Sequence, residues 1–558
     1  MLEYDIEATL ARLIEIGPRA PGSWAELKAA EFIHGKLCEF GYDARIERFV
    51  AGSHNAEVSL LELEGSTEEF PSLPTQFAAA GDVTGELLYL GNSTAPLVGM
   101  DALSGKIGLL FPSGPHSNLI PFVLELEKAG LAGLVVISSQ MDNLETKLVR
   151  YPEVTRLPIA VVSWRTGNRL VRLEGQTARL RITQCATPRG GESQNVVAEL
   201  PGTGAARLIV SAHHDTAAYA PGPLDNGGGT AMLLELAKRL AGKQFPATIT
   251  FVSSGSEENG GDDCCGAGAK AFYASRMDWI EQIVAHVEVD DIGNLVGVPG
   301  MVYGGPKGFT DAAFNAAIRA SFGLKTSHSP SCDHGIAVKN GLPFVFVCDA
   351  GAVPRPCYHS PEDTLDFMSI AKCAWHMPFI LGMVERLAAS RPFLPYVRDG
   401  ERLIRPARYA DHDAIADITK AAFGPVCMAK LREDHFGEEI GGAPWHVHKS
   451  AGVLGGIRSR PYDAIVCEIA RTVVGYATLG LNRGTGIAEI GNNAVHPDWQ
   501  GRGIGSAMQR EVARRMDAEG FTRFAVSTLT NDLPAQHVYE KLGYKQIVGT
   551  VHYLRENG

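Results

Sequence analysis

Apolar segments of strand length alternate with helical patterns from residue 207 onwards, and this alternation limits the possible folds more than any other feature of the chain. Strands that alternate with helices form mainly parallel sheets covered by helices. We therefore predict an α/β fold with a mixed, mainly parallel sheet, on which the helices expected within residues 2–40 also pack. The apolar runs lie at residues 208–210, 249–252, 283–289 and 344–347, and the helical patterns at 230–240 and 369–387.

The length of 558 residues requires several cores, because a domain usually takes roughly 150 residues. Between residues 85 and 185 the pattern changes to short β-rich pieces, which predicts an inserted module or, alternatively, an extra lobe of the first domain. A linker at residues 390–392 precedes a new alternation of helix and strand, so we place a boundary near residue 395. The predicted domains are a first domain at 1–84 and 186–392, an insertion at 85–185, and a C-terminal α+β domain at 402–558.

The composition excludes several classes of protein. A formal charge of −12 and a pI near 5.8 argue against a nucleic-acid partner, which requires a basic surface. Residues 1–16 resemble an acidic amphipathic helix rather than a signal peptide, and no apolar run of about 18 residues occurs, so we expect a cytoplasmic protein without membrane contact. The ten cysteines contain no C-x-x-C pair, which argues against a zinc ribbon and a thioredoxin-type site.

Histidines and carboxylates follow successive predicted strands. Side chains at the carboxyl ends of parallel strands face a common crevice. Two Zn²⁺ ions held close together need imidazole and carboxylate ligands, an anionic bridge and an open position for water. Each residue taken singly also fits a solvated loop carboxylate or a core histidine, but the ordered series favours a metal site. The series comprises His213, Asp215, Asp225, Glu257, Glu258, Asp290 and His359.

This series resembles the di-zinc aminopeptidases of metallopeptidase family 28, which carry H-x-D, then D-N in a glycine-rich turn, then E-E, D and H. The resemblance covers roughly residues 1–390 apart from the insertion. It implies that His213 and Asp290 hold one zinc ion and that Glu258 and His359 hold the other. Asp225 would bridge the two ions. Zinc is the default metal, although cobalt or manganese accept similar ligands.

The same resemblance implies roles for three neighbouring residues. Glu257 would be the general base that takes a proton from water and passes it to the leaving amine. Asp215 would orient His213 through its second ring nitrogen, and Tyr358 would stabilise the oxyanion of the tetrahedral intermediate.

The chain departs from the family pattern around Asp290. The family more often has asparagine in place of Glu288 and an apolar residue in place of Asp291, which leaves the choice between Asp290 and Asp291 open. Alternation along a strand places Glu288 and Asp290 on one side and Asp291 on the other. Residues 332–334, which read Cys-Asp-His, either line the specificity pocket or make structural hydrogen bonds.

The inserted segment resembles a protease-associated domain in its position, its β composition and the turn at residues 130–137. A plain extra lobe of the catalytic domain remains the alternative interpretation.

A glycine-rich turn between a predicted strand and a predicted helix lies near residue 500. Backbone N–H groups and the helix dipole at such a turn bind pyrophosphate, although a plain strand-to-helix connection has the same form. Gln500, Gly503 and Gly505 in this turn resemble the acetyl-coenzyme A motif Q-x-x-G-x-G of GNAT acetyltransferases. The resemblance covers about residues 402–558. It implies that Tyr539 protonates the coenzyme thiolate. Glu489 is a candidate for the base that accepts the proton of the amine. The implied coenzyme-binding residues are Val495, Gln500, Gly501, Arg502, Gly503, Gly505, Ser506 and Asn531.

The sequence thus predicts a zinc-dependent exopeptidase that removes N-terminal amino acids from peptides, joined to an acetyl-coenzyme A-dependent N-acetyltransferase domain with an unknown amine acceptor. A carboxypeptidase, deacylase or glutaminyl cyclase of the same fold is the first alternative. The second is an acetyltransferase whose peptidase half only binds peptides. The oligomeric state stays open.

Overall fold

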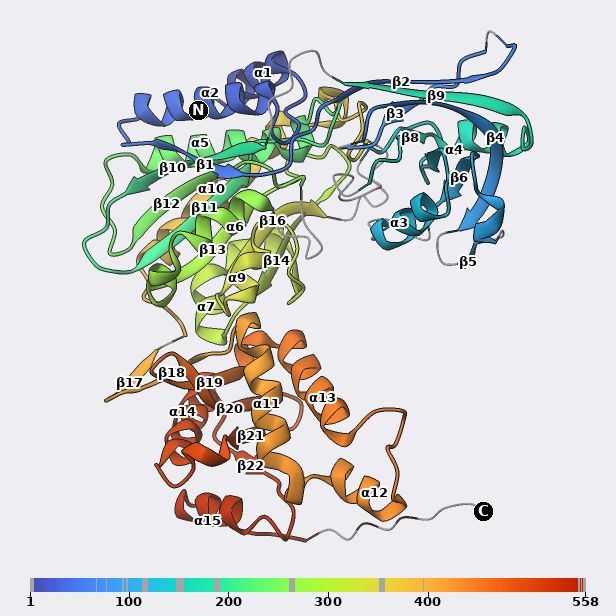
Figure 1. Ribbon diagram of the computed structural model, residues 1–558. Helices are drawn as coiled ribbons and strands as arrows, with labels where there is room; N and C mark the ends of the chain where they lie inside the picture. Colours follow the sequence, from blue (N-terminus) through green and yellow to red (C-terminus); the bar gives the residue numbers. More distant parts are fainter. Residues whose placement is uncertain are drawn as a thin grey trace.

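The fold is described from a computed structural model of the chain. Its described strands form three sheets, which Figure 1 shows in three regions of the molecule. The structure describes residues 5–66, 68–76, 78–92, 95–96, 99–112, 119–146, 155–184, 191–259, 266–350, 357–394, 396–549, 552 and 554.

The central sheet has its parallel strands in the middle and antiparallel pairings on both sides of them. The strands β12, β11, β13 and β16 are parallel neighbours, and their residues are mostly buried, as expected for strands covered on both faces. This arrangement confirms the predicted mixed, mainly parallel sheet. In spatial order the strands are β1 (Arg45–Val50), β10 (Glu192–Leu200), β12 (Thr248–Ser254), β11 (Arg207–His213), β13 (Ile283–Val289), β16 (Phe344–Ala350), β14 (Val298–Gly304) and β15 (Gly323–Thr326).

Helices cover both faces of the central sheet. Alternate residues of β11 separate the two cores: Leu208 and Val210 belong to one and Ile209 to the other. The smaller core packs α6 (Ala267–Ala274) and α9 (Gly335–Lys339). The larger core packs α1 (Ile6–Ile16), α2 (Trp24–Glu39), α5 (Gly228–Leu240), α7 (Lys307–Ala313), α8 (Ala316–Ser321) and α10 (Ile370–Ala388).

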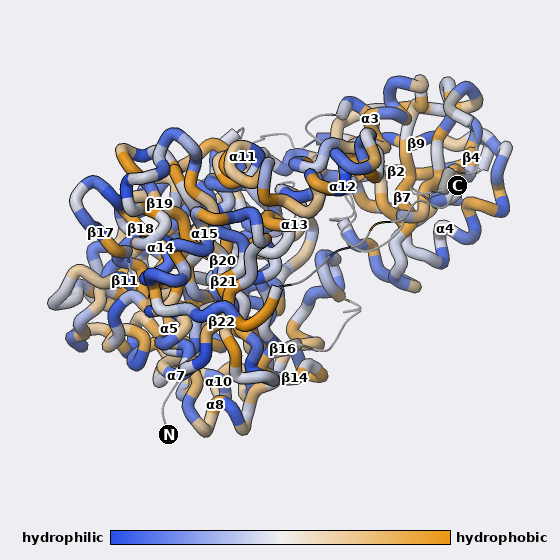
Figure 2. Tube along the Cα trace, turned by 90° about the horizontal axis from the view of Figure 1, so that it is seen from below, coloured by the Kyte–Doolittle hydropathy of each residue, from blue (hydrophilic) through white to orange (hydrophobic). Residues whose placement is uncertain are grey.

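A second sheet forms a lobe beside the central one (Figure 1). Two strands and the start of a third precede residue 85, so the sheet reaches further towards the N-terminus than the segment 85–185 that the pattern sets apart. Figure 2 shows apolar stretches along β2, β7 and β9 and hydrophilic loops around them. The lobe contains β2 (Ala56–Leu63), β9 (Thr177–Gln184), β4 (Gly81–Asn92), β6 (Ile107–Phe111), β7 (Gly133–Ile137), β8 (Ile159–Val162), β3 (Leu73–Pro74), β5 (Ala95–Pro96), α3 (Ile120–Lys128) and α4 (Trp164–Val171).

The C-terminal sheet is antiparallel except for its last pair, β21 with β22, which is parallel over three residue pairs. α14 packs on one face, and α11 and α13 pack on the other. This confirms the predicted separate α+β unit. Its elements are β17 (Val397–Asp399), β18 (Arg402–Pro406), α11 (His412–Phe423), α12 (Met428–Phe436), α13 (Trp445–Ser459), β19 (Ala464–Ile469), β20 (Thr472–Asn482), β21 (Ile487–Val495), α14 (Ile504–Ala518), β22 (Phe524–Val526) and α15 (Leu533–Lys541).

One tyrosine joins the C-terminal unit to the central region. Tyr462 packs in the smaller core of the central sheet, and its hydroxyl donates a hydrogen bond to the carbonyl of Leu342 at 3.0 Å. Across the described ranges, no helix combines the length and the apolar character needed to cross a membrane.

Candidate metal centre and a second pocket

The carboxyl ends of the central parallel strands bring the predicted ligands to one edge of the sheet. β11 ends at His213, Glu258 follows β12, and Asp290 follows β13. His359 lies beyond β16, and Asp225 lies in the short turn of helix Pro223–Gly227 that precedes α5. Parallel strands place their carboxyl ends at the same crevice, so residues distant in sequence meet there.

The five side chains form two groups that share one carboxylate. Nε2 of His213 lies 3.2 Å from Oδ1 of Asp225 and 3.4 Å from Oδ1 of Asp290. Nε2 of His359 lies 3.2 Å from Oδ2 of Asp225 and 3.4 Å from Oε2 of Glu258. Asp225 therefore presents one oxygen to each group. Within each group the three ligand atoms lie within 4.8 Å of one another.

These residues fit a pair of zinc ions. Ligand atoms about 2.0–2.2 Å from a tetrahedral ion lie about 3.3–3.6 Å apart, and the four distances of 3.2 and 3.4 Å are close to the lower end of that range. Three carboxylates are buried together, an arrangement that costs free energy unless cations offset their charges. Burial raises the pKa of Asp290 to about 7, the nearby His213 opposes this, and Asp225 and Glu288 add to it. A divalent cation would remove that penalty.

Asp215 holds the segment that carries the predicted base and one ligand. Its two carboxylate oxygens accept hydrogen bonds from the backbone N–H groups of Glu257 and Glu258, each at 3.0 Å. Nδ1 of His213 lies 3.1 Å from the carbonyl oxygen of Asp215 and 3.5 Å from its carboxylate. Asp215 thus contacts His213 at the predicted nitrogen and also fixes the Glu257–Glu258 backbone, which the sequence pattern did not indicate.

A second carboxylate, that of Asp363, fixes the backbone at Asp225, the ligand shared by the two groups. Asp363 is buried, and its two oxygens accept hydrogen bonds from the N–H groups of Leu224 and Asp225 at 3.1 Å each. Sequence reasoning missed Asp363, although it lies only four residues after His359.

The choice between Asp290 and Asp291 has a geometric answer. Asp290 belongs to the group of ligand atoms, whereas the N–H of Asp291 donates to Oδ1 of Asp290 at 2.7 Å. Glu288 accepts hydrogen bonds from the N–H groups of Asp333 and His334 and lies 2.5 Å from Nδ1 of His334. Residues 333 and 334 therefore make the structural hydrogen bonds that were one of their two interpretations.

The remaining predicted residues of this site lie beside the ligands. Glu257 is buried between Ser256 and Glu258 and belongs to neither group of ligand atoms. The ring of Tyr358 stacks on that of His359, with the ring centroids 3.5 Å apart.

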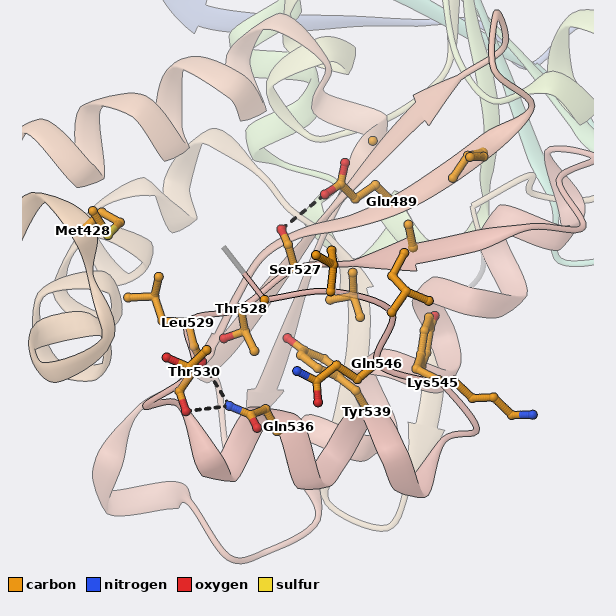
Figure 3. Close-up of a pocket in the computed structure, with 18 of the residues that line it drawn as sticks. Met428, Glu489, Ser527, Thr528, Leu529, Thr530, Gln536, Tyr539, Lys545 and Gln546 are labelled. Atoms are coloured by element: carbon orange, nitrogen blue, oxygen red, sulfur yellow. Dashed lines mark hydrogen bonds between the residues drawn. The ribbon is translucent and has the colours of Figure 1, made fainter. Parts of the chain in front are cut away.

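A pocket of about 1110 Å³ lies in the C-terminal unit, and Glu489, Asn531 and Tyr539 are among its lining residues. Figure 3 shows Tyr539 and Gln536 on α15 facing this pocket, with Ser527 hydrogen-bonded to Glu489. The side-chain amide of Asn493 donates to the Tyr539 hydroxyl at 3.1 Å. Burial raises the pKa of Tyr539.

The glycine-rich turn lies outside the lining of that pocket. Gly501 and Gly503 both adopt the left-handed backbone conformation, and Gly503 directly precedes α14. The side-chain amide of Gln500 donates to the carbonyl of Val495 at 3.0 Å, which ties the turn to the end of β21. Arg502, Gly505 and Ser506 belong to the same turn and first helical residues.

Comparisons with known proteins give relatives that are named as aminopeptidases or peptidases. Aminopeptidase YwaD of Bacillus subtilis is 24% identical over 392 residues, covering 65% of this chain and 80% of that protein. The structure of BSAP, a zinc aminopeptidase from Bacillus subtilis, superposes with a TM-score of 0.55 at 19% identity, covering 69% of this chain and 95% of that one. A peptidase M28 precursor from Shewanella amazonensis superposes with a TM-score of 0.59 at 19% identity, covering 69% and 93% of the two chains.

Two family models match separate parts of the chain. Residues 195–381 match the model described as peptidase family M28, and residues 429–544 match the model of the acetyltransferase (GNAT) family. The first match spans all five candidate ligands, from His213 to His359, and the second spans the glycine-rich turn and Tyr539. The chain therefore combines a peptidase family M28 domain with a C-terminal GNAT acetyltransferase domain.

Proposed function

We propose that this protein is an aminopeptidase that uses two zinc ions to remove N-terminal residues from peptides. The observation that carries the proposal is Asp225, whose two oxygens face two separate imidazole–carboxylate pairs. His213 and Asp290 would hold one ion, and Glu258 and His359 the other. Zinc bound at these ligands supplies a Lewis acid that polarises the scissile carbonyl and lowers the pKa of water.

The side chains around the ligands perform the proton transfers. Glu257 takes a proton from the attacking water and delivers it to the leaving amine as the C–N bond breaks. Asp215 fixes the Glu257 backbone and so sets the position of this carboxylate. The hydroxyl of Tyr358 donates a hydrogen bond to the oxyanion that develops on the carbonyl oxygen.

Exopeptidase action is supported by the charge of the site and by the relatives. Asp291 adds a buried carboxylate next to Asp290, and this local negative charge suits a positively charged α-amino group. Aminopeptidase YwaD and a probable lipoprotein aminopeptidase of Mycobacterium tuberculosis, LpqL, are both named for this activity.

The test is chromophore release from a panel of aminoacyl p-nitroanilides by the wild type and Glu257→Gln, with the zinc content of both measured. We expect the wild type to cleave and Glu257→Gln to keep its zinc while kcat falls by roughly 10²–10⁴-fold, because general-base catalysis contributes about that much. Glu362→Gln, a change to an exposed carboxylate in the loop of His359, is the matched control and should cleave normally.

An N-acetylated anilide separates exopeptidase action from other hydrolysis, and the wild type should leave it intact. Cleavage of the blocked substrate at the same rate would instead support a deacylase or an endopeptidase. A zinc-loaded wild type that cleaves no anilide would rule out the aminopeptidase proposal.

We further propose that the C-terminal domain transfers the acetyl group of acetyl-coenzyme A to an amine. The pocket that contains Tyr539, together with the glycine-rich turn before α14, supports this second activity. The amine nitrogen attacks the thioester carbonyl, the C–S bond breaks, Tyr539 protonates the thiolate, and a base such as Glu489 accepts the amine proton. The residues that would bind the coenzyme are Val495, Gln500, Gly501, Arg502, Gly503, Gly505, Ser506 and Asn531.

We propose a domain organisation that follows the sequence prediction except at the start of the insertion. The prediction gives the peptidase domain residues 1–84 and 186–392, the protease-associated-like insertion residues 85–185, and the acetyltransferase domain residues 402–558. Because β2 and β3 pair within the lobe sheet, we propose that the inserted lobe begins near residue 56. The lobe sheet supports an insertion as a unit, since its strands pair only with one another in the described residues.

A further inference from the structure

The lobe reaches the metal centre through two buried residues. Gln76 follows β3, and Thr146 lies in the segment between β7 and β8. Their side chains are at most 1% exposed. The backbone N–H of Gln76 donates to the carbonyl of Thr146 at 2.9 Å, so the two residues form one contact point.

Gln76 uses both ends of its amide on the central region. Its Nε2 donates a hydrogen bond to the backbone carbonyl of Glu258 at 2.7 Å. Its Oε1 accepts one from the N–H of Ala218 at 3.1 Å. One side chain therefore connects the backbone of a candidate metal ligand to the segment that follows His213 and Asp215.

Thr146 makes a parallel set of contacts to the other ligand of the same ion. Its N–H donates to the carbonyl of His359 at 3.0 Å. Its hydroxyl donates to the carbonyl of Ala218 at 2.8 Å and lies 3.2 Å from the carbonyl of His359. Gln76 and Thr146 thus meet at Ala218 and hold Glu258 and His359 from the lobe side.

The two groups of ligands differ in this support. The carbonyl of His213 accepts a hydrogen bond from the Thr230 hydroxyl at 2.8 Å, and the N–H of Asp290 donates to the carbonyl of Val347 at 3.0 Å. Both of these partners belong to the central region. Within the described residues, the lobe's hydrogen bonds to ligand backbones go to Glu258 and His359 alone.

We propose that Gln76 and Thr146 are positioning residues for the Glu258–His359 metal site, so that the lobe controls the affinity for one of the two ions. This inference rests on the proposed two-zinc centre. Glu258 and His359 lie in loops rather than at strand ends, and a ligand on a loop needs its backbone fixed before binding. The lobe supplies the fixed donors, whereas the ordered strands β11 and β13 position His213 and Asp290.

The test is a calorimetric titration of the metal-free full-length protein with zinc, in the wild type, Gln76→Met and Thr146→Val. Gln76→Met keeps the length of the side chain but removes both amide hydrogen bonds. Thr146→Val keeps the shape and the backbone N–H but removes the hydroxyl. We expect two zinc ions in the wild type, at least a tenfold loss of affinity for one ion in Gln76→Met, and a smaller loss for the same ion in Thr146→Val.

Tyr219→Phe is the matched control, because the Tyr219 hydroxyl donates to the carbonyl of Ala56 at 3.0 Å and so joins lobe and central region through a hydrogen bond that involves no candidate ligand. Its two affinities should equal those of the wild type. Anomalous scattering from crystals of Gln76→Met grown at limiting zinc should place the retained ion between His213 and Asp290. Thermal unfolding of each metal-free variant checks that it folds. If Gln76→Met does not fold, the zinc affinities of Thr146→Val test the proposal.

Three results would overturn this assignment: an equal loss of affinity for both zinc ions, unchanged affinities in both variants, or the binding of a single ion by the wild type. A wild type that binds two ions but cleaves no anilide would reject the aminopeptidase function while leaving the positioning result intact. The two proposals therefore fail in distinguishable ways.

Discussion

The metal centre and the C-terminal pocket are organised in opposite ways. All five candidate ligands of the metal centre are buried, and buried partners hold their backbones. The pocket in the C-terminal domain is large, and Glu489 and Asn531 at its border are exposed, with Tyr539 the buried member. In the proposed function, the first site is therefore shaped before metal binds, whereas the long, flexible coenzyme would complete the second site.

The difference arises from one hydrogen-bonding arrangement that occurs three times in the central region. Asp215, Asp363 and Glu288 each accept hydrogen bonds from two consecutive backbone N–H groups. A buried carboxylate that accepts two such hydrogen bonds fixes a loop in a single conformation, because charge-assisted hydrogen bonds are strong. These three side chains therefore tie the loops of the metal centre to buried acceptors.

Removal of the metal should separate the two sites most clearly. We expect chelation to reduce anilide cleavage to background and added zinc to restore it, because the polarising charge is lost and regained. Binding of acetyl-coenzyme A should change by less than twofold, since no candidate ligand lies in the C-terminal domain. Calorimetry with the coenzyme before and after chelation measures this, and a coenzyme affinity that fell with the metal would break the comparison.

A change at Asp363 should lower the affinity for both zinc ions, whereas Gln76→Met should lower the affinity for only one. Asp363→Ala leaves the buried N–H groups of Leu224 and Asp225 without their acceptor, which costs roughly 1–3 kcal/mol each. Because Asp225 faces both groups of ligands, we expect at least a tenfold loss of zinc affinity at each site, together with a lower unfolding temperature.

Asp363→Asn keeps one carbonyl acceptor and should give intermediate values in the same zinc titration and in scanning calorimetry. Loss of affinity at one ion alone would argue that Asp225 is not the shared ligand.

Tyr539→Phe should produce the most local change of the three, confined to the C-terminal domain. We expect release of free thiol from acetyl-coenzyme A in the presence of amines to slow by roughly 100-fold, the lower end of what general acid catalysis contributes, because a phenylalanine cannot protonate the thiolate. Anilide cleavage should stay at the wild-type rate. A matching loss of peptidase activity would mean that the two domains are coupled, and Tyr544→Phe, a change in the same pocket, is the control.

The sequence pattern was sufficient to predict that the ligands lie close together, because their positions follow from the strands that precede them. His213, Glu258 and Asp290 each end or closely follow a parallel strand, so the strand order alone sends them to one edge. The pattern could not place Gln76 or Thr146, because both contact the ligands across more than 180 residues of sequence. It also missed the reach of the lobe sheet to β2, since a half-buried strand carries a weak apolar signal.

The amino-acid sequence by itself determined the fold class, the presence of two unlike domains and the chemical types that gather at the strand ends. These depend on periodicity and on residue order, which are local properties of a chain. Only the tertiary structure decided that Asp290 rather than Asp291 faces His213, that Asp215 and Asp363 fix the backbones of the ligand loops, and that the lobe contacts the backbones of Glu258 and His359. Those contacts depend on how separate segments pack in space, and local pattern does not encode that packing.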